Sequence, residues 1–175
     1  MMMMTTRKKP FNAENQRWYQ KDKNLLALVG RLQKMPISLM ETYCNCVIEY
    51  IMELYQQDDK KLLFIESRSE KHQALIKSLD KKRWYDKNLY SYRAFNAMYL
   101  MDGLRRKELV SRLINTQALL HAYNERCLQC ELQPSMEVLG HLLLVCVKLG
   151  EQDALLELVL LEAQGKLSQL TKTVN

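Results

Sequence analysis

Apolar residues recur along much of the chain with the spacing of an α-helix. Between Asn24 and Met35 they occupy positions i, i+3, i+4 and i+7, which places them on one face of a helix. These residues are Leu25, Leu28, Val29 and Leu32. Pro36 follows, and because proline cannot continue a helix we expect the first helix to end there.

A second helix is predicted from about Leu39 to Gln57. Ser38 and Glu41 have the spacing of a capping box, in which each side chain bonds the other residue's backbone N–H. The apolar stripe of this segment is wide enough for a core helix. It consists of Tyr43, Cys44, Val47, Ile48, Ile51, Met52 and Tyr55.

The middle of the chain predicts three further helical segments. Asp58 and Asp59 favour a helix start, so we expect a helix from about Lys60 to Lys82. A stripe of Tyr92, Phe95, Met98 and Tyr99 follows Leu89, and Asp102-Gly103 indicates a turn. One long helix is then predicted from Leu104 to about Asn124, with inward-facing Leu109, Val110, Leu113, Ile114, Ala118 and Leu119.

The end of the chain predicts a helical hairpin, residues 135–165. Pro134 and Ser135 precede a helix from Met136 to Leu149, and Gly150 can end it in the left-handed conformation. A last helix, about Gln152 to Gln164, ends at Gly165 for the same reason. The short link makes the two helices antiparallel neighbours. With its Leu-rich helices and glycine turn, this hairpin resembles one unit of a tetratricopeptide or pentatricopeptide array, although it lacks the small/large signature of either.

Composition supports a helical fold. The 175 residues include only five Gly and three Pro, whereas sheet proteins need many tight turns rich in both. We therefore predict an all-α helical bundle or short α-superhelix of about six to seven helices. Residues 1–12 are expected to form a disordered tail, residues 13–165 a single all-α domain, and residues 166–175 a C-terminal tail. The small subunits of RNA-guided interference complexes are similar in size and class, without a shared motif.

One internal repeat stands out. Arg17-Trp18-Tyr19 recurs as Arg83-Trp84-Tyr85 at an offset of 66, and Lys21 recurs as Lys87. The same offset matches Met35 with Met101 and Ile48 with Ile114, and it aligns the apolar stripes between them. We therefore predict a duplicated helical unit, residues 17–80 and 83–130, whose copies share a core.

Charge is unevenly distributed. Residues 1–112 carry a net charge of +9 and residues 113–175 a net charge of −3, which together make the formal +6 of the whole chain. The basic part can meet an acidic partner, or it can simply be a lysine-rich solvated surface. The strongest candidate for a membrane span, Val138 to Leu149, is shorter than the ~20 residues that a span needs, and it contains His141 and Lys148. We expect a cytoplasmic, reducing compartment and no membrane.

The two Arg-Trp-Tyr motifs and their neighbouring basic residues are the candidate contact site. Trp and Tyr can stack on unpaired bases while Lys and Arg neutralise phosphates. Alternatively, each Trp anchors its own unit's helices, with Trp18 near Val29 or Leu32 and Trp84 near Phe95 or Met98. The candidate residues are Arg17, Trp18, Tyr19, Lys21, Lys81, Lys82, Arg83, Trp84, Tyr85 and Lys87.

The other reactive side chains form no recognisable site. Cys127 and Cys130 have the spacing of half a zinc knuckle, but Cys44 and Cys46 diverge around a helix, so small buried hydrophobes are the favoured interpretation. His72, His121 and His141 lie outside any metal-ligand or nucleophile motif. We therefore expect no catalytic, cofactor-binding or metal-binding residues.

The predicted function is a non-catalytic helical protein–protein interaction module, an adaptor or a subunit of a larger assembly. The alternative is an accessory nucleic-acid-binding protein that uses the basic and aromatic residues of 1–112. The third hypothesis, that the protein is an enzyme, is disfavoured because the sequence contains no recognisable catalytic motif. The partner is expected to be a protein or a multi-subunit complex, with nucleic acid as the alternative.

Overall fold

The computed structural model describes residues 17–58 and 84–170. Within these ranges it contains α-helices and short 3-10 helices and no strand, which confirms the all-α class. The elements in chain order are the 3-10 helix η2 (Trp18–Lys21), α1 (Lys23–Lys34), α2 (Ile37–Leu54), the 3-10 helix η3 (Trp84–Lys87), α4 (Leu89–Leu100), α5 (Gly103–Ile114), α6 (Gln117–Gln129), α7 (Met136–Leu149) and α8 (Glu151–Ala163). The predicted helix 60–82 and the predicted tail 1–12 lie outside the described residues.

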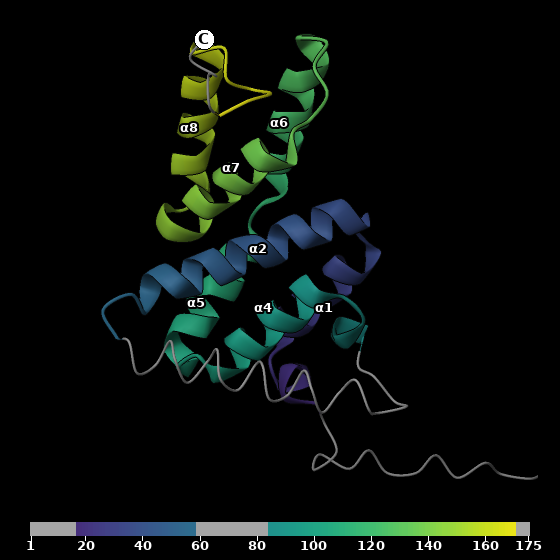
Figure 1. Ribbon diagram of the computed structural model, residues 1–175, viewed down its shortest axis with the longest axis vertical. Coiled ribbons are helices and arrows are strands. Elements are labelled where there is room, and N and C mark those ends of the chain that lie inside the picture. The colour runs from purple at the N-terminus through teal and green to yellow at the C-terminus, as the bar shows by residue number, and fades with distance from the viewer. Residues whose placement is uncertain (1–16, 59–83, 171–175) are drawn as a thin grey trace, which may run out of the picture.

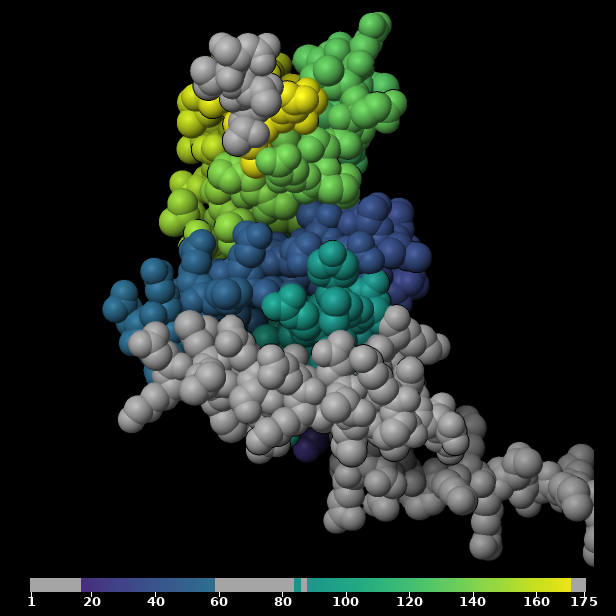
Figure 2. Space-filling view, in the orientation of Figure 1, coloured from purple at the N-terminus to yellow at the C-terminus, as the bar shows by residue number. Residues whose placement is uncertain are grey.

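Helix α2 is the centre of the molecule. Helices α1, α4 and α5 lie on one side of it, and α6, α7 and α8 lie on the other (Figures 1 and 2). It packs closely on both α4 and α7, and the buried side chains of both sides form one core. A helix covered on two faces needs a wide apolar stripe, which is why the stripe predicted for this segment is so broad.

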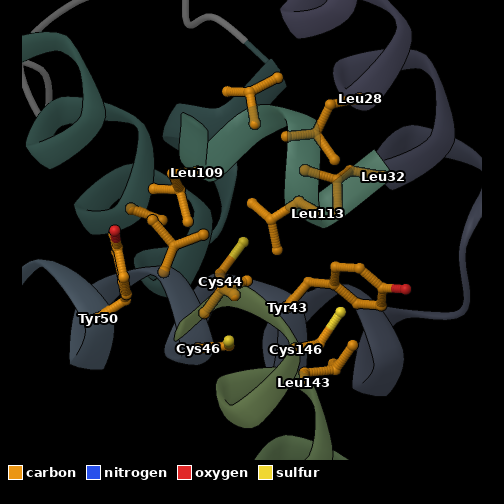
Figure 3. Packing of buried hydrophobic residues seen from close by; sticks show 14 of the residues in the cluster. Leu28, Leu32, Tyr43, Cys44, Cys46, Tyr50, Leu109, Leu113, Leu143 and Cys146 are labelled. Atoms are coloured by element: carbon orange, nitrogen blue, oxygen red, sulfur yellow. The ribbon is translucent and has the colours of Figure 1, made fainter. Parts of the chain in front are cut away.

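Cys44 and Cys46 illustrate the two buried faces of α2. Cys44 lies with Phe95 and Leu113 on the side of α4 and α5. Cys46 lies on the opposite side, toward α7 and Cys146 (Figure 3). The sequence correctly predicts that these side chains diverge around the helix, and both are buried because neighbouring helices cover both faces.

The element boundaries repeat at the offset found in the sequence. Helix η2 starts at Trp18 and η3 at Trp84, both α1 and α4 have 12 residues, and the C-caps are Met35 and Met101. Both N-caps, Asp22 and Asn88, accept hydrogen bonds from the amides two and three residues later. This agreement supports the duplicated unit, while its origin by duplication stays a prediction.

The two matching segments pack crosswise. At the offset of 66 residues, α1 corresponds to α4, and α2 corresponds to α5. Helix α1 packs on α5, and α4 packs on α2. Exchanging the two segments therefore preserves the pattern of contacts, as around a two-fold axis. Tyr19 and its counterpart Tyr85 meet with ring centroids 6.3 Å apart, as equivalent residues beside such an axis do.

Three arginines bond carbonyl groups at the C-terminal ends of neighbouring helices. Arg31 Nη1 donates to the Ile114 carbonyl of α5 over 2.6 Å. Arg106 Nη1 donates to two carbonyls near the end of α4, and Arg112 Nη1 donates to two at the end of α7. The last carbonyls of a helix lack backbone partners and carry partial negative charge, so these cations stabilise the helix ends. Part of the basic surplus of residues 1–112 is therefore structural.

The single helix predicted from Leu104 to Asn124 is interrupted. Helix α5 ends at Ile114, and α6 begins at Gln117. The buried Thr116 hydroxyl bonds both the Leu113 carbonyl and the Tyr43 hydroxyl, which holds the chain in a turn. Ala118, predicted to face inward, is consequently exposed.

The predicted capping box of Ser38 and Glu41 is also wrong. Helix α2 begins at Ile37 with Pro36 as its N-cap, and no side chain caps it. The fixed φ of proline suits the start of a helix, so Ser38 lies within the first turn, where its carbonyl accepts a hydrogen bond from Thr42. Met52, predicted to belong to the buried stripe, is exposed.

The predicted hairpin has nearly the expected bounds. Gly165 has the left-handed φ of +68°, as predicted, whereas Gly150 combines a φ of +109° with an extended ψ of 168°. Residues 166–170, expected to start a tail, return to the bundle. Leu167 is buried, and its carbonyl accepts a hydrogen bond from Tyr123 over 3.0 Å.

Candidate interaction surfaces

The tyrosines of the Arg-Trp-Tyr motifs are core residues. Tyr19 is 4% exposed and Tyr85 is 1% exposed. The Tyr85 ring stacks on Phe95 with an interplanar angle of 17° and a centroid separation of 5.2 Å. Neither ring has surface left for stacking on a base, so both act in the fold.

The tryptophans are partly buried and meet the same phenylalanine. Trp84 packs edge-on against Phe95 at 5.1 Å, as the anchoring interpretation expects. Trp18 also packs near Phe95, at 6.3 Å, and lies 5.4 Å from Tyr99. Trp18 therefore contacts α4 of the other unit as well as Tyr19 of its own motif, which lies edge-on at 5.9 Å.

The cations around Trp18 are held by the fold. Arg106 lies 5.6 Å from the centre of the Trp18 ring while it bonds the α4 carbonyls. Arg17 donates to the Tyr19 hydroxyl over 2.9 Å. Tyr99 is 56% exposed beside them, so Trp18, Tyr99 and Arg106 form a small aromatic and basic surface that the sequence spacing could not reveal.

The remaining candidate residues do not join this surface in the described structure. Lys21 is exposed at the end of η2. Lys81, Lys82 and Arg83 lie outside the described residues, and so does the side chain of Lys87. The basic run between the two units therefore stays a sequence-based candidate.

A more extensive apolar surface lies on helix α8. One face of this helix packs on α6 and α7 through Ala154, Leu158 and Leu161. The opposite face is also apolar and is exposed to solvent. Leu156, Val159 and Leu160 are 63%, 47% and 54% exposed, and Ala163 is exposed one turn further on. We call these four residues the α8 face.

Residues of the α8 face share one side of the helix. Spacings of three and four residues place them in neighbouring positions on the helix surface. They form a stripe opposite the buried Ala154, Leu158 and Leu161. Helix α8 itself lies at the edge of the molecule (Figures 1 and 2). The sequence contains the signal for this face, because a surface helix is normally apolar on one side only and α8 is apolar on both.

Acidic residues flank the α8 face on both sides. At 100° per residue, Asp153 and Glu157 fall on one side of the stripe, and Glu151 and Glu162 fall on the other. Helix α8 contains no Lys or Arg. Glu162 pairs with Arg126 of α6, and Glu157 lies 3.0 Å from His141 of α7. The surroundings of the apolar stripe are therefore predominantly negative.

A cleft of about 440 Å³ lies between α2 and α7. Its lining includes Asn45, Cys46, Glu49, Glu137 and His141. Burial, helped by nearby Glu49, raises the pKa of the Cys46 thiol. Because the thiolate is the reactive form of cysteine, this shift keeps Cys46 in its less reactive thiol form at neutral pH.

The cysteines are four buried residues and one exposed residue. None forms a disulfide in the structure, and Cys130, expected to be buried, is exposed at the end of α6. Among the described residues, no group of His, Cys, Asp and Glu side chains is arranged to hold a metal ion. No helix in the described ranges is long and apolar enough to cross a membrane.

No protein-family model matches the chain, and comparison with curated proteins and with solved structures gives no match. A function must therefore be argued from the surfaces described above.

Proposed function

We propose that this chain is a non-catalytic helical protein–protein interaction module, acting as an adaptor or as a subunit of a larger assembly. The observation that carries the proposal is the α8 face. A helix at the surface of a folded domain normally has a polar outer side, because that side faces water. Helix α8 instead exposes three large aliphatic side chains in one stripe.

The stripe differs from the ordinary exposed hydrophobic residues of this protein. Single exposed apolar residues are common on soluble proteins and need no explanation. Leu104 is 82% exposed, yet Arg105, Lys107 and Glu108 beside it are polar. On α8 the apolar residues adjoin one another along the helix, and contiguous apolar surface is typical of binding sites.

A comparison of two variants tests this proposal. The double substitution Leu156→Ser with Leu160→Ser removes most of the apolar stripe, whereas Leu104→Ser removes one exposed leucine elsewhere. Both variants should melt close to the parent, because exposed leucines contribute little to stability. The tagged parent and the Leu104→Ser control should copurify the same discrete partner from the source cell, and the double variant should lose it. Retention of that partner by the double variant would refute the proposal.

The second candidate function is accessory nucleic-acid binding. The observation in its favour is the surface of Trp18, Tyr99 and Arg106, where an exposed aromatic ring lies beside a cation. Single-stranded nucleic acids bind such surfaces by stacking and phosphate neutralisation. Its test is binding of a fluorescent single strand over a range of salt concentrations, because phosphate contacts make affinity fall steeply with salt. Tyr99→Ala should weaken that binding and lower the melting temperature only slightly, because the Tyr99 ring is more than half exposed.

A further inference from the structure

We infer that the α8 face binds a cationic amphipathic α-helix from a partner protein. This inference rests on the proposed function and specifies its partner. The shape of the face indicates a helix as the occupant. Leu156 and Leu160 are four residues apart, and Leu156 and Val159 are three apart, which are the spacings of the ridges that pack into the grooves of another helix. Ala163 is small and permits close approach at the end of the stripe.

The dimensions of α8 agree with that occupant. A helix of 13 residues is about 20 Å long at 1.5 Å per residue, so a partner segment of about four turns would cover it. Binding as an added β-strand requires an exposed sheet edge, and the described ranges contain no strand. A helix laid along α8 would bury its own apolar stripe in the way that α7 already does on the opposite side.

The charges beside the α8 face determine which kind of partner helix can bind there. The acidic residues Glu151, Asp153, Glu157 and Glu162 flank the stripe on both sides, and no cation lies within the helix. Arg126 offsets Glu162, His141 meets Glu157, and Lys166 follows the end of the helix, so the flanks remain negative overall. Lys or Arg residues beside the apolar stripe of a partner helix would meet these carboxylates, and a helix with acidic flanks would be repelled.

The test uses three synthetic helical peptides of about 14 residues, which is about 21 Å of helix. All three have the same stripe of Leu and Ala. The remaining positions are all Lys in the first peptide, all Gln in the second and all Glu in the third. Their binding to the full-length protein is measured by fluorescence anisotropy. We expect the Lys peptide to bind at least about tenfold more tightly than the Glu peptide, with a difference that shrinks when salt is raised from about 0.05 M to about 0.5 M.

Three variants locate the binding. Leu156→Ser with Leu160→Ser should weaken the Lys peptide at least about tenfold, as expected for the centre of an interface, whereas Leu104→Ser should leave its affinity unchanged. Asp153→Lys should narrow the difference between the Lys and Glu peptides, and Glu49→Lys, the same change of charge on α2, should not. Circular dichroism of each variant confirms that it is folded.

The possible negative results contradict different parts of the account: the charge of the partner, the binding site or the proposed function. Equal or tighter binding of the Glu or Gln peptide at the α8 face would overturn the cationic partner and leave the interaction module standing. Lys-peptide binding that survives loss of the stripe would overturn the site. If no peptide binds, or if the protein instead self-associates through this face and the Lys peptide cannot compete, the inference is wrong. Partner copurification that is unaffected by the double variant would refute the proposed function itself.

Discussion

Phe95 is the residue on which the aromatic side chains of the two repeated motifs converge. Its ring stacks on Tyr85 and contacts both Trp18 and Trp84. It is fully enclosed within the core. The two motifs therefore act together at one site, and each tryptophan contributes to the same aromatic cluster.

Replacement of either tryptophan by alanine should lower stability. Removal of a buried aromatic side chain costs about 3–5 kcal/mol, and because Trp18 and Trp84 are only partly buried we expect about 2–3 kcal/mol. The measurement is thermal or urea unfolding of Trp18→Ala and Trp84→Ala beside the parent. Two unshifted transitions would contradict the anchoring role and favour a contact role for these residues.

Several ionisable groups of the core are held in their protonated forms. Burial raises the pKa of Tyr43, Tyr123 and Cys44 to about 12, and that of Cys146 to about 11. Their ordinary values are 10.0 for tyrosine and 9.0 for cysteine. The folded state therefore retains protons that the unfolded chain releases first.

This difference predicts alkaline destabilisation. The stabilising contribution of each group is complete below its unfolded pKa and is lost as pH rises through the folded value, which gives a window from about pH 9 to 12. Each titrating group costs up to about 1.4 kcal/mol per pH unit in that window. Urea unfolding at a series of pH values should show a flat region near neutrality and then a steep decline. The slope should be shallower in Tyr43→Phe, where Thr116 keeps its bond to Leu113. A stability that stayed constant up to pH 11 would rule out this burial effect.

At the scale of elements, helix ends are stabilised by distant side chains. Arg112 comes from α5, and it bonds the Val147 and Lys148 carbonyls of α7 over 2.7 Å and 2.6 Å. It also pairs with Glu108 over 2.8 Å. One side chain therefore ties the two sides of the molecule together at the end of a helix.

Arg112→Met should destabilise the protein by about 1.5–3 kcal/mol, the usual contribution of hydrogen bonds made by a charged group. Arg93→Met replaces an exposed arginine of α4 and should change stability by less than about 0.5 kcal/mol. Chemical unfolding of both variants checks the prediction. Equal effects of the two substitutions would show that the carbonyl contacts of Arg112 contribute nothing.

Replacement by alanine should have opposite effects on stability at two glycines, one between helices and one within a helix. Gly150 has a φ of +109° between α7 and α8, a conformation that L-residues rarely adopt, so Gly150→Ala should cost about 1–3 kcal/mol. Gly30 lies within α1 with no atom within 4 Å of an added Cβ, so Gly30→Ala should raise stability by about 0.5–1 kcal/mol. Melting temperatures that move in the same direction for both variants would contradict this assignment.

The helices themselves could be predicted from the sequence because each has a periodic stripe and recognisable ends. Pro36 and Gly150 mark helix boundaries through their own backbone chemistry, and the predicted range Met136 to Leu149 is the observed one. The break at Thr116 could not be predicted, because it depends on a hydrogen bond to Tyr43, which is 73 residues away in the sequence. The pattern of residues within one segment contains no information about a hydrogen-bond partner that is brought close only by the tertiary fold.

The candidate site was less predictable than the fold. The Arg-Trp-Tyr motifs are conspicuous in the sequence, yet their tyrosines are buried and Arg106, which stacks on Trp18, belongs to no motif. The α8 face had a local signal, since Leu156, Val159 and Leu160 give the helix a second apolar face opposite the one formed by Ala154, Leu158 and Leu161. The sequence does not indicate which of the two apolar faces is buried, because this depends on how α8 packs on α6 and α7.

As a whole molecule, the protein has α1, α4 and α5 on one side of α2, and α6, α7 and α8 on the other (Figure 1). The two matching segments cover each other, because α1 packs on α5 and α4 packs on α2. The hairpin is open, because α8 is covered on one side only. This asymmetry places the exposed apolar surface at one end of the molecule, away from the aromatic core of the repeated units (Figure 1).

Photo-crosslinking in the source cell tests the interaction surface most directly. A photoreactive amino acid at Val159 would sample the α8 face, and the same group at Ser111, an exposed position of α5, is the matched control. We predict that irradiation joins position 159, and not position 111, to one discrete partner protein through a helix rich in Lys or Arg. Equal crosslinking at the two positions, or none at position 159, would contradict a protein-binding role for the α8 face.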